Sequence, residues 1–190
     1  PFDHPLADQM AYLLSGESLE QALYWIGTTY AALLPPETRQ RNGVFYTPPV
    51  LADRLLDQVS KQGIDWSHAK VLDPASGCGV FLLLSARRML RASSLTSGSD
   101  LAKRLFGREL DPFSAWISDV FIQEEISRTL PAPSSQTPQI CFTRVMDSLR
   151  DFPQEHTQFD LVVGNPPYGK IKLSAKERDM WKRGIYGHAN

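Results

Sequence analysis

The sequence predicts an α/β fold with a mostly parallel sheet and helices on both faces. From residue 70 onward, short apolar runs alternate with amphipathic stretches of helical length. Strands that alternate with helices of about 10–15 residues are typical of parallel sheets. The chain has 190 residues, of which 42% are hydrophobic and 22% charged, so it is long and apolar enough for one globular domain.

Helical patterns come first along the chain. Apolar residues at helical spacing run from Leu6 to Leu14, and a second run opens at Ser18, which forms a capping-box pattern with Gln21. Two prolines at 35 and 36 end this run. A third helix is expected after Thr47, a candidate N-cap. We therefore assign residues 1–42 to an N-terminal helical segment.

The sheet is expected in the remainder of the chain. Residues 92–100 and 131–139 are rich in Ser, Pro or Gly and predict surface loops. The predicted elements between them are the strand 71–72, the helix 80–91, the strand 105–110, the helix 113–128 and the strands 140–143 and 159–163.

Composition excludes several classes of protein. The formal net charge of −1 argues against a broadly basic DNA-coating protein, although it allows a local basic face. No apolar stretch is long enough to span a membrane, and no signal peptide is visible. Cys78 and Cys141 form no C-x-x-C pattern, which argues against a disulfide framework and a zinc site. We expect a cytoplasmic protein without a metal.

A glycine-rich loop joins the first strand to its helix. The loop Asp73–Gly79 has the sequence Asp-Pro-Ala-Ser-Gly-Cys-Gly. Ligands of open α/β sheets bind at the carboxyl ends of strands, where such loops lie, and glycine lets the backbone approach a ligand closely. Taken alone, the loop fits a tight turn without a ligand about equally well.

An acidic residue at the end of the second strand favours a ligand. Glu109 lies where a carboxylate can accept the hydroxyls of a ribose. The dinucleotide fingerprint is absent, because Leu82 stands in place of its third glycine, and there is no G-K-[ST] phosphate loop. These features favour a nucleoside without phosphates, and S-adenosylmethionine is the obvious candidate.

A second polar corner follows the last predicted strand. Asn165, Pro166, Pro167 and Tyr168 come directly after the apolar run 159–163. The prolines stiffen the chain, the asparagine offers hydrogen-bond acceptors and donors, and the tyrosine offers a flat face. Together these residue types suit a planar substrate that carries an amine.

Taken in their order along the chain, these motifs resemble the amino-group DNA methyltransferases of the N6-adenine type. The resemblance is to the members whose cofactor motifs precede the catalytic motif, and to the methyltransferases of type II restriction–modification systems. The matching segments are Gly43-Val-Phe-Tyr-Thr-Pro-Pro49, Val71-Leu-Asp-Pro-Ala-Ser-Gly-Cys-Gly79, Gly107-Arg-Glu-Leu-Asp-Pro112, Val145-Met-Asp-Ser-Leu149 and Phe159-Asp-Leu-Val-Val-Gly-Asn-Pro-Pro-Tyr168. The resemblance implies a Rossmann-like, S-adenosylmethionine-dependent methyltransferase fold.

The resemblance also implies a role for each cofactor residue. Thr47 is expected to contact the methionine carboxylate beside the loop residues Asp73, Ala75, Gly77 and Gly79. Glu109 is expected to hold the ribose hydroxyls. Asp147 is expected to accept from the adenine amine of the cofactor, with Ser148 alongside.

For catalysis, the resemblance implies that Asn165 and the Pro166 carbonyl accept from the amine of the target base, on which Tyr168 stacks. Two acceptors would stabilise the positive charge that develops on the attacking nitrogen. A base inside a duplex cannot reach such a corner, so the target adenine is expected to flip out of double-stranded DNA. The scheme needs no metal.

The resemblance further implies that the chain is incomplete. Residues 43–190 are expected to form the first part of the catalytic domain, truncated after the fourth strand, which would be an unfinished edge. The later strands and a target-recognition region are expected outside this chain, so activity of the chain alone is doubtful.

Two other interpretations remain open. In the first, the chain belongs to a methyltransferase with another acceptor. Protein methyltransferases that act on a glutamine amide use a similar Asn-Pro-Pro-Tyr corner, and an RNA base methyltransferase is the next alternative. The segment Phe45-Tyr-Thr-Pro-Pro49 favours the DNA enzymes over both. In the second interpretation the chain is an inactive fragment that binds only cofactor or DNA.

Overall fold

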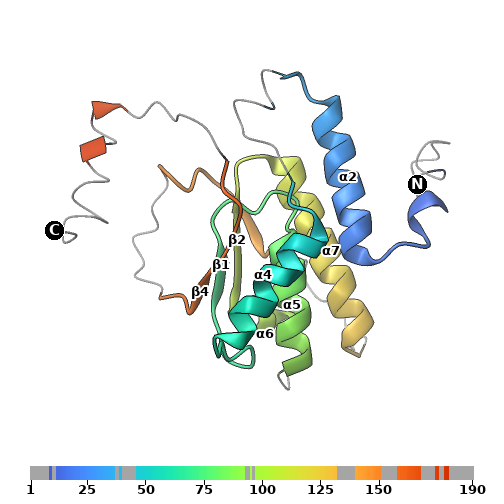
Figure 1. Ribbon diagram of the computed structural model, residues 1–190, viewed down its shortest axis with the longest axis vertical. Helices are drawn as coiled ribbons and strands as arrows, with labels where there is room; N and C mark the ends of the chain where they lie inside the picture. Colours follow the sequence, from blue (N-terminus) through green and yellow to red (C-terminus); the bar gives the residue numbers. More distant parts are fainter. Residues whose placement is uncertain are drawn as a thin grey trace.

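The protein is an α/β structure built on a parallel sheet (Figure 1). The computed structural model describes residues 12–36, 46–92, 97–131, 140–150 and 158–167, together with positions 9, 39, 95, 174, 175, 178 and 179. Its strands are β1 (Val71–Asp73), β2 (Leu105–Glu109), β3 (Thr143–Val145) and β4 (Leu161–Val162). They lie in the order β3-β2-β1-β4, and every pair is parallel. The predicted Rossmann-like class is confirmed.

The helices form two layers on one side of this sheet (Figure 1). Helices α5 (Val80–Ala92) and α7 (Pro112–Thr129) pack against the strands, α2 (Leu19–Leu33) packs on both of them, and α4 (Pro49–Lys61) packs on α5. The short helix α6 (Gly98–Leu101) contacts α5. Among the described residues no helix covers the opposite face, so the predicted helices on both faces are not found there, because every described crossover helix packs on the same side.

The core is centred on α5, whose sequence is apolar on nearly every side. Phe81, Leu82, Leu84 and Met89 are buried in one cluster with Val71 of the central strand. Leu83 points into a second cluster with residues of α2 and α7. Because α5 begins directly after Gly79, burial of this helix fixes one end of the glycine-rich loop.

Helix α2 is tied to the rest of the fold by a partly buried charge cluster. Arg87 of α5 donates to Glu125 of α7 and to Glu20 of α2, at distances of 2.8–2.9 Å. These contacts lower the pKa of Glu20 against the opposing effect of its burial. The proposed domain boundary at residue 42 stays a prediction, although α2 packs directly on the helices of the sheet.

Three local expectations were tested at the helix ends. Ser18 is the N-cap of α2, and its side chain accepts from the backbone N–H of Gln21, as predicted. Thr47 is not the N-cap of α4; Pro48 is, and no side chain caps that end. The predicted loop 92–100 contains the start of α6, which Ser97 caps through the backbone N–H of Asp100.

The third strand begins three residues later than predicted, at Thr143 instead of 140. Pairing with β2 begins at Thr143, opposite Gly107, and the carboxylate of Asp119 in α7 accepts the backbone N–H groups of Phe142 and Thr143 at 3.1 and 2.9 Å. The segment before β3 is thereby bonded to a helix. Parts of two other predictions, the run 6–14 and the loop 131–139, lie outside the described residues.

Candidate functional site

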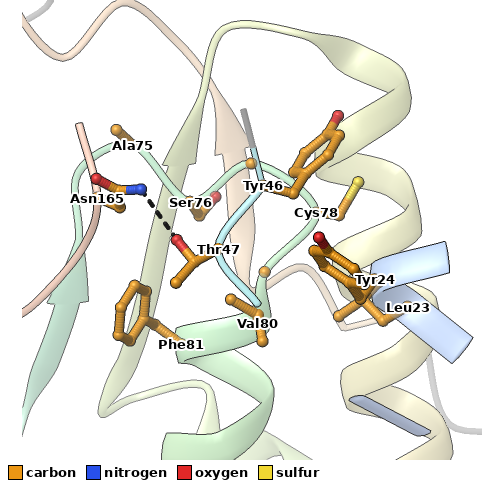
Figure 2. A pocket seen from close by; sticks show the side chains of 12 residues that line it. Leu23, Tyr24, Tyr46, Thr47, Ala75, Ser76, Cys78, Val80, Phe81 and Asn165 are labelled. Atoms are coloured by element: carbon orange, nitrogen blue, oxygen red, sulfur yellow. Dashed lines mark hydrogen bonds between the residues drawn. The ribbon is translucent and has the colours of Figure 1, made fainter. Parts of the chain in front are cut away.

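The sequence-predicted site residues gather at the carboxyl edge of the sheet. A pocket there is lined by residues 75–81 of the loop and the start of α5, by Asn165 after β4 and by Thr47 before α4 (Figure 2). Leu23 and Tyr24 of α2 and Tyr46 complete the lining. Chain segments distant in sequence therefore converge on one face of the glycine-rich loop.

Two glycines give this loop its path. Gly77 and Gly79 have φ values of 54° and 89°, which side chains of L-residues rarely adopt. A Cβ at Gly77 would lie 3.1 Å from the ring of Tyr46, and a Cβ at Gly79 would collide with the hydroxyl of Ser118 in α7. Both positions therefore require glycine for conformation and for space.

Glu109 holds the loop from the neighbouring strand. Its Oε2 accepts the backbone N–H of Gly77 at 2.8 Å, and its Oε1 accepts those of Leu110 and Asp111, each at 2.8 Å. Burial raises the pKa of Glu109, and the three backbone hydrogen bonds act in the opposite direction. Since a carboxylate offers about four acceptor positions, one position of Glu109 is left for another donor.

Asp73 at the end of β1 is the most deeply buried acid of the site. Its side chain is 1% exposed, and Oδ1 accepts the backbone N–H of Ala75 at 3.1 Å. Oδ2 is buried and has no hydrogen-bond partner among the described residues. Burial raises the pKa of Asp73 to about 7. Such an oxygen suits a hydrogen-bond donor or a cation that arrives with a ligand.

Asp147 and Ser148 follow β3, as predicted, but their contacts are local or directed at the loop. Ser148 donates from its hydroxyl to the carbonyl of Pro74 at 2.6 Å. The Asp147 carboxylate accepts the backbone N–H of Leu149 at 2.9 Å and lies 3.2 Å from Arg150. Ser148 thus supports the start of the loop, and the expected contact of Asp147 with a ligand stays a prediction.

Asn165 contacts Thr47 across the pocket. Its Nδ2 donates to the Thr47 hydroxyl at 3.1 Å, as the dashed line in Figure 2 shows. Pro166 and Pro167 are exposed after it. Tyr168, the fourth residue of the predicted catalytic corner, lies outside the described residues.

Sequence reasoning missed the wall that helix α2 and Tyr46 provide. The Tyr46 ring packs between Gly27 of α2 and Gly77 of the loop, and its hydroxyl lies 3.0 Å from that of Ser114. Burial raises the pKa of Tyr46 strongly, so its phenol stays neutral. The one available signal was Gly27, a small residue on the apolar face of a predicted helix, which permits close approach of another chain segment.

Two kinds of feature, a metal-ligand cluster and a membrane-spanning helix, are absent from the described residues. Within the described ranges, no three or more His, Cys, Asp or Glu side chains lie close enough together to hold a metal ion. No helix in the same ranges combines the length and the apolar character needed to cross a membrane.

Replacing Gly79 by alanine is expected to destabilise the protein more than replacing Gly63. Both glycines have φ near 90°, but nothing lies within 4 Å of a Cβ at Gly63, whereas Ser118 blocks it at Gly79. The conformational cost of about 1–2 kcal/mol is shared by both variants, and overpacking adds about 1–3 kcal/mol at Gly79 alone. Urea unfolding of the two variants measures the difference. Equal losses of stability would contradict the close approach of the loop and α7.

The buried carboxyl of Asp73 is expected to make stability depend on pH. Its pKa of about 7 in the folded protein exceeds the value of about 3.9 of an unfolded chain, so the folded state binds the proton more tightly. The protonated Asp73 carboxyl therefore stabilises the folded state at low pH. This stabilisation is lost as the pH rises from about 4 to about 7, and the loss in free energy of unfolding is at most about 4 kcal/mol. Unfolding of wild type and Asp73→Asn across this range should show a steeper decline for wild type. Parallel curves would contradict the raised pKa.

Comparisons with known proteins place the chain in a family. The family described as N-6 DNA Methylase matches residues 25–190. The type II methyltransferase M.VspI of Vibrio sp. (strain 343) is 27% identical over 155 residues, which cover 79% of this chain and 31% of that protein. A cryoEM structure of a DrdV–DNA complex has a TM-score of 0.48 and 16% identity, covering 78% of this chain and 16% of that one. Because the family match covers residues 25–190, which is most of the chain and includes the whole sheet, the chain belongs to the N-6 DNA methylase family.

Proposed function

We propose that this chain carries the cofactor-binding and catalytic residues of a DNA methyltransferase that transfers a methyl group from S-adenosylmethionine to the N6 amine of adenine. The observation that carries the proposal is the position of Asn165. The Asn165 amide lines the pocket formed by the glycine-rich loop. Asn165 follows β4, the strand that pairs with β1. An amide acceptor beside a nucleoside site is what methylation of an exocyclic amine requires.

The residues present fit S-adenosylmethionine. Glu109 retains an acceptor position for ribose hydroxyls, and the unpartnered Oδ2 of Asp73 suits a cationic group such as the α-ammonium of the methionine part. Thr47 and the main chain of residues 75–79 line the pocket where a carboxylate is expected. Asp147 and Ser148 are proposed to meet the adenine end. When bound, the cofactor supplies a methyl group on a sulfonium, an electrophile with a good leaving group.

The chain's own residues would orient and activate the substrate amine. The lone pair of an exocyclic amine is delocalised into the ring, which makes it a poor nucleophile. The Asn165 side-chain oxygen and the Pro166 carbonyl would accept its two N–H groups and stabilise the charge that develops on nitrogen. Pro166 and Pro167 would hold these acceptors in place, and Tyr168 is proposed to stack on the base.

Double-stranded DNA is the proposed substrate, with the target adenine flipped out of the helix. The name of the relative M.VspI supports a role in a type II restriction–modification system. With that role we propose a cytoplasmic protein. The chain spans 31% of that relative, so target recognition is assigned to sequence outside the chain. A glutamine amide in a protein and a base in RNA are the alternative acceptors that the same corner could take.

Cofactor binding is expected to depend on Glu109. In Glu109→Gln the single oxygen offers two acceptor positions to three backbone N–H groups and the ribose, and the new NH₂ group only donates, so affinity for S-adenosylmethionine should fall by about tenfold or more. Calorimetry measures the affinity, and thermal unfolding shows whether the variant is folded. Glu124→Gln, at an exposed ion pair with Arg128, is the control and should bind as wild type does. Unchanged affinity of folded Glu109→Gln would remove Glu109 from the cofactor site.

Methyl transfer is expected to require Asn165. With radiolabelled S-adenosylmethionine, the full-length wild-type protein that contains this chain should label adenine-containing duplex DNA, and Asn165→Ala in the same protein should lower the rate by about a hundredfold or more while still binding cofactor. The same assay offers RNA and protein as acceptors. Labelling of protein or RNA in preference to DNA would overturn the DNA assignment, and full activity of Asn165→Ala would overturn the catalytic one.

A further inference from the structure

One contact of the site joins a residue expected to bind cofactor to the residue expected to bind substrate. Thr47 lies before α4 and Asn165 after β4, and the Asn165 Nδ2 donates to the Thr47 hydroxyl at 3.1 Å (Figure 2). We propose that Thr47 is a positioning residue that fixes which end of the Asn165 amide faces the substrate. This inference rests on the proposed function and adds a role to Thr47.

The two ends of an asparagine side chain differ in chemistry but barely in shape. The oxygen accepts hydrogen bonds and the NH₂ group only donates them, so rotating the amide by half a turn exchanges an acceptor for a donor. Methylation of an amine needs the oxygen of Asn165 on the substrate side. With Nδ2 bonded to Thr47, Oδ1 points away from Thr47 and stays available as an acceptor.

A threonine hydroxyl can donate as well as accept. It selects the NH₂ end of the Asn165 amide firmly only when its proton is donated to another group. A capping threonine accepts a backbone N–H through its oxygen, and no such side-chain hydrogen bond is made at the start of α4, so the Thr47 oxygen can accept from Asn165. The hydroxyl proton remains a donor for a carboxylate bound in the pocket that Thr47 lines. Once the proton is committed, the oxygen can only accept, and only the NH₂ end of Asn165 satisfies it.

Both partners sit on constrained backbone, which makes the contact reproducible. Thr47 lies between the half-buried Tyr46 and the prolines Pro48 and Pro49. The carbonyl of Pro48 accepts the backbone N–H groups that open α4. Asn165 lies two residues after the buried Val163 and directly before two prolines. Proline restricts its own φ and the conformation of the preceding residue, so Asn165 and Thr47 have few alternative positions.

The contact itself can be tested without turnover, by NMR of the Asn165 side-chain amide. Asparagine occurs only at positions 42, 165 and 190, so selective ¹⁵N-asparagine labelling gives a simple spectrum. In wild type and Thr47→Ser, one Nδ2 proton should be shifted downfield and protected from exchange. In Thr47→Val, which keeps the shape but loses the hydroxyl, both signatures should disappear. Identical amide spectra of wild type and Thr47→Val would overturn the inference.

The functional consequence is tested by kinetics at saturating cofactor. Thr47→Val should lower kcat by about twofold to tenfold, the loss expected for one neutral hydrogen bond, with the KM for DNA unchanged. Thr47→Ser should restore kcat, because it restores the hydroxyl. Thr129→Val is the matched control, since the Thr129 hydroxyl bonds within α7, to the carbonyl of Glu125.

The outcomes separate the inference from the proposed function. If Thr47→Val changes only the KM for cofactor and leaves kcat at the wild-type value, Thr47 is a cofactor contact and the positioning role is wrong. If wild type transfers no methyl group to DNA, the proposed function fails, and the NMR experiment still decides whether Thr47 sets the orientation of Asn165.

Discussion

The site depends on the carboxylate of Glu109. By accepting the N–H groups of Gly77, Leu110 and Asp111, it joins the loop after β1 to the end of β2 and to the start of α7. The backbone of Ser76 adds to this connection through its hydrogen bond to the carbonyl of Arg108. A carboxylate that orders three backbone donors and keeps one acceptor position free can hold a loop and a ligand together.

Other side chains contact the glycine-rich loop on the sides that Glu109 does not reach. Ser118 of α7 fills the space beside Gly79, Tyr46 packs against Gly77, and Ser148 after β3 holds the carbonyl of Pro74. The loop is thus in contact with neighbouring strands, a helix and the segment before α4. Such support from several elements preorganises a site, because little of the binding free energy is then spent on ordering the backbone.

The sequence was sufficient to predict those parts of the site that follow from local pattern. The loop 73–79, Glu109 and Asn165 lie at or shortly after the carboxyl ends of strands, and parallel strands bring these ends to one edge of the sheet. It was not sufficient where distant side chains compete for a backbone group or a hydroxyl. Asp119 accepts the backbone N–H groups at the start of β3, and Asn165 uses the hydroxyl of Thr47 that was expected to cap a helix. Both contacts arise only from tertiary packing.

The most direct test of this account is the identity of the methylated nucleoside. DNA from cells that express the protein, digested to nucleosides and measured by mass spectrometry, should contain N6-methyladenine, and DNA from cells that express the Asn165→Ala variant should not. Methylated cytosine in place of N6-methyladenine, or equal N6-methyladenine with the variant, would contradict the account.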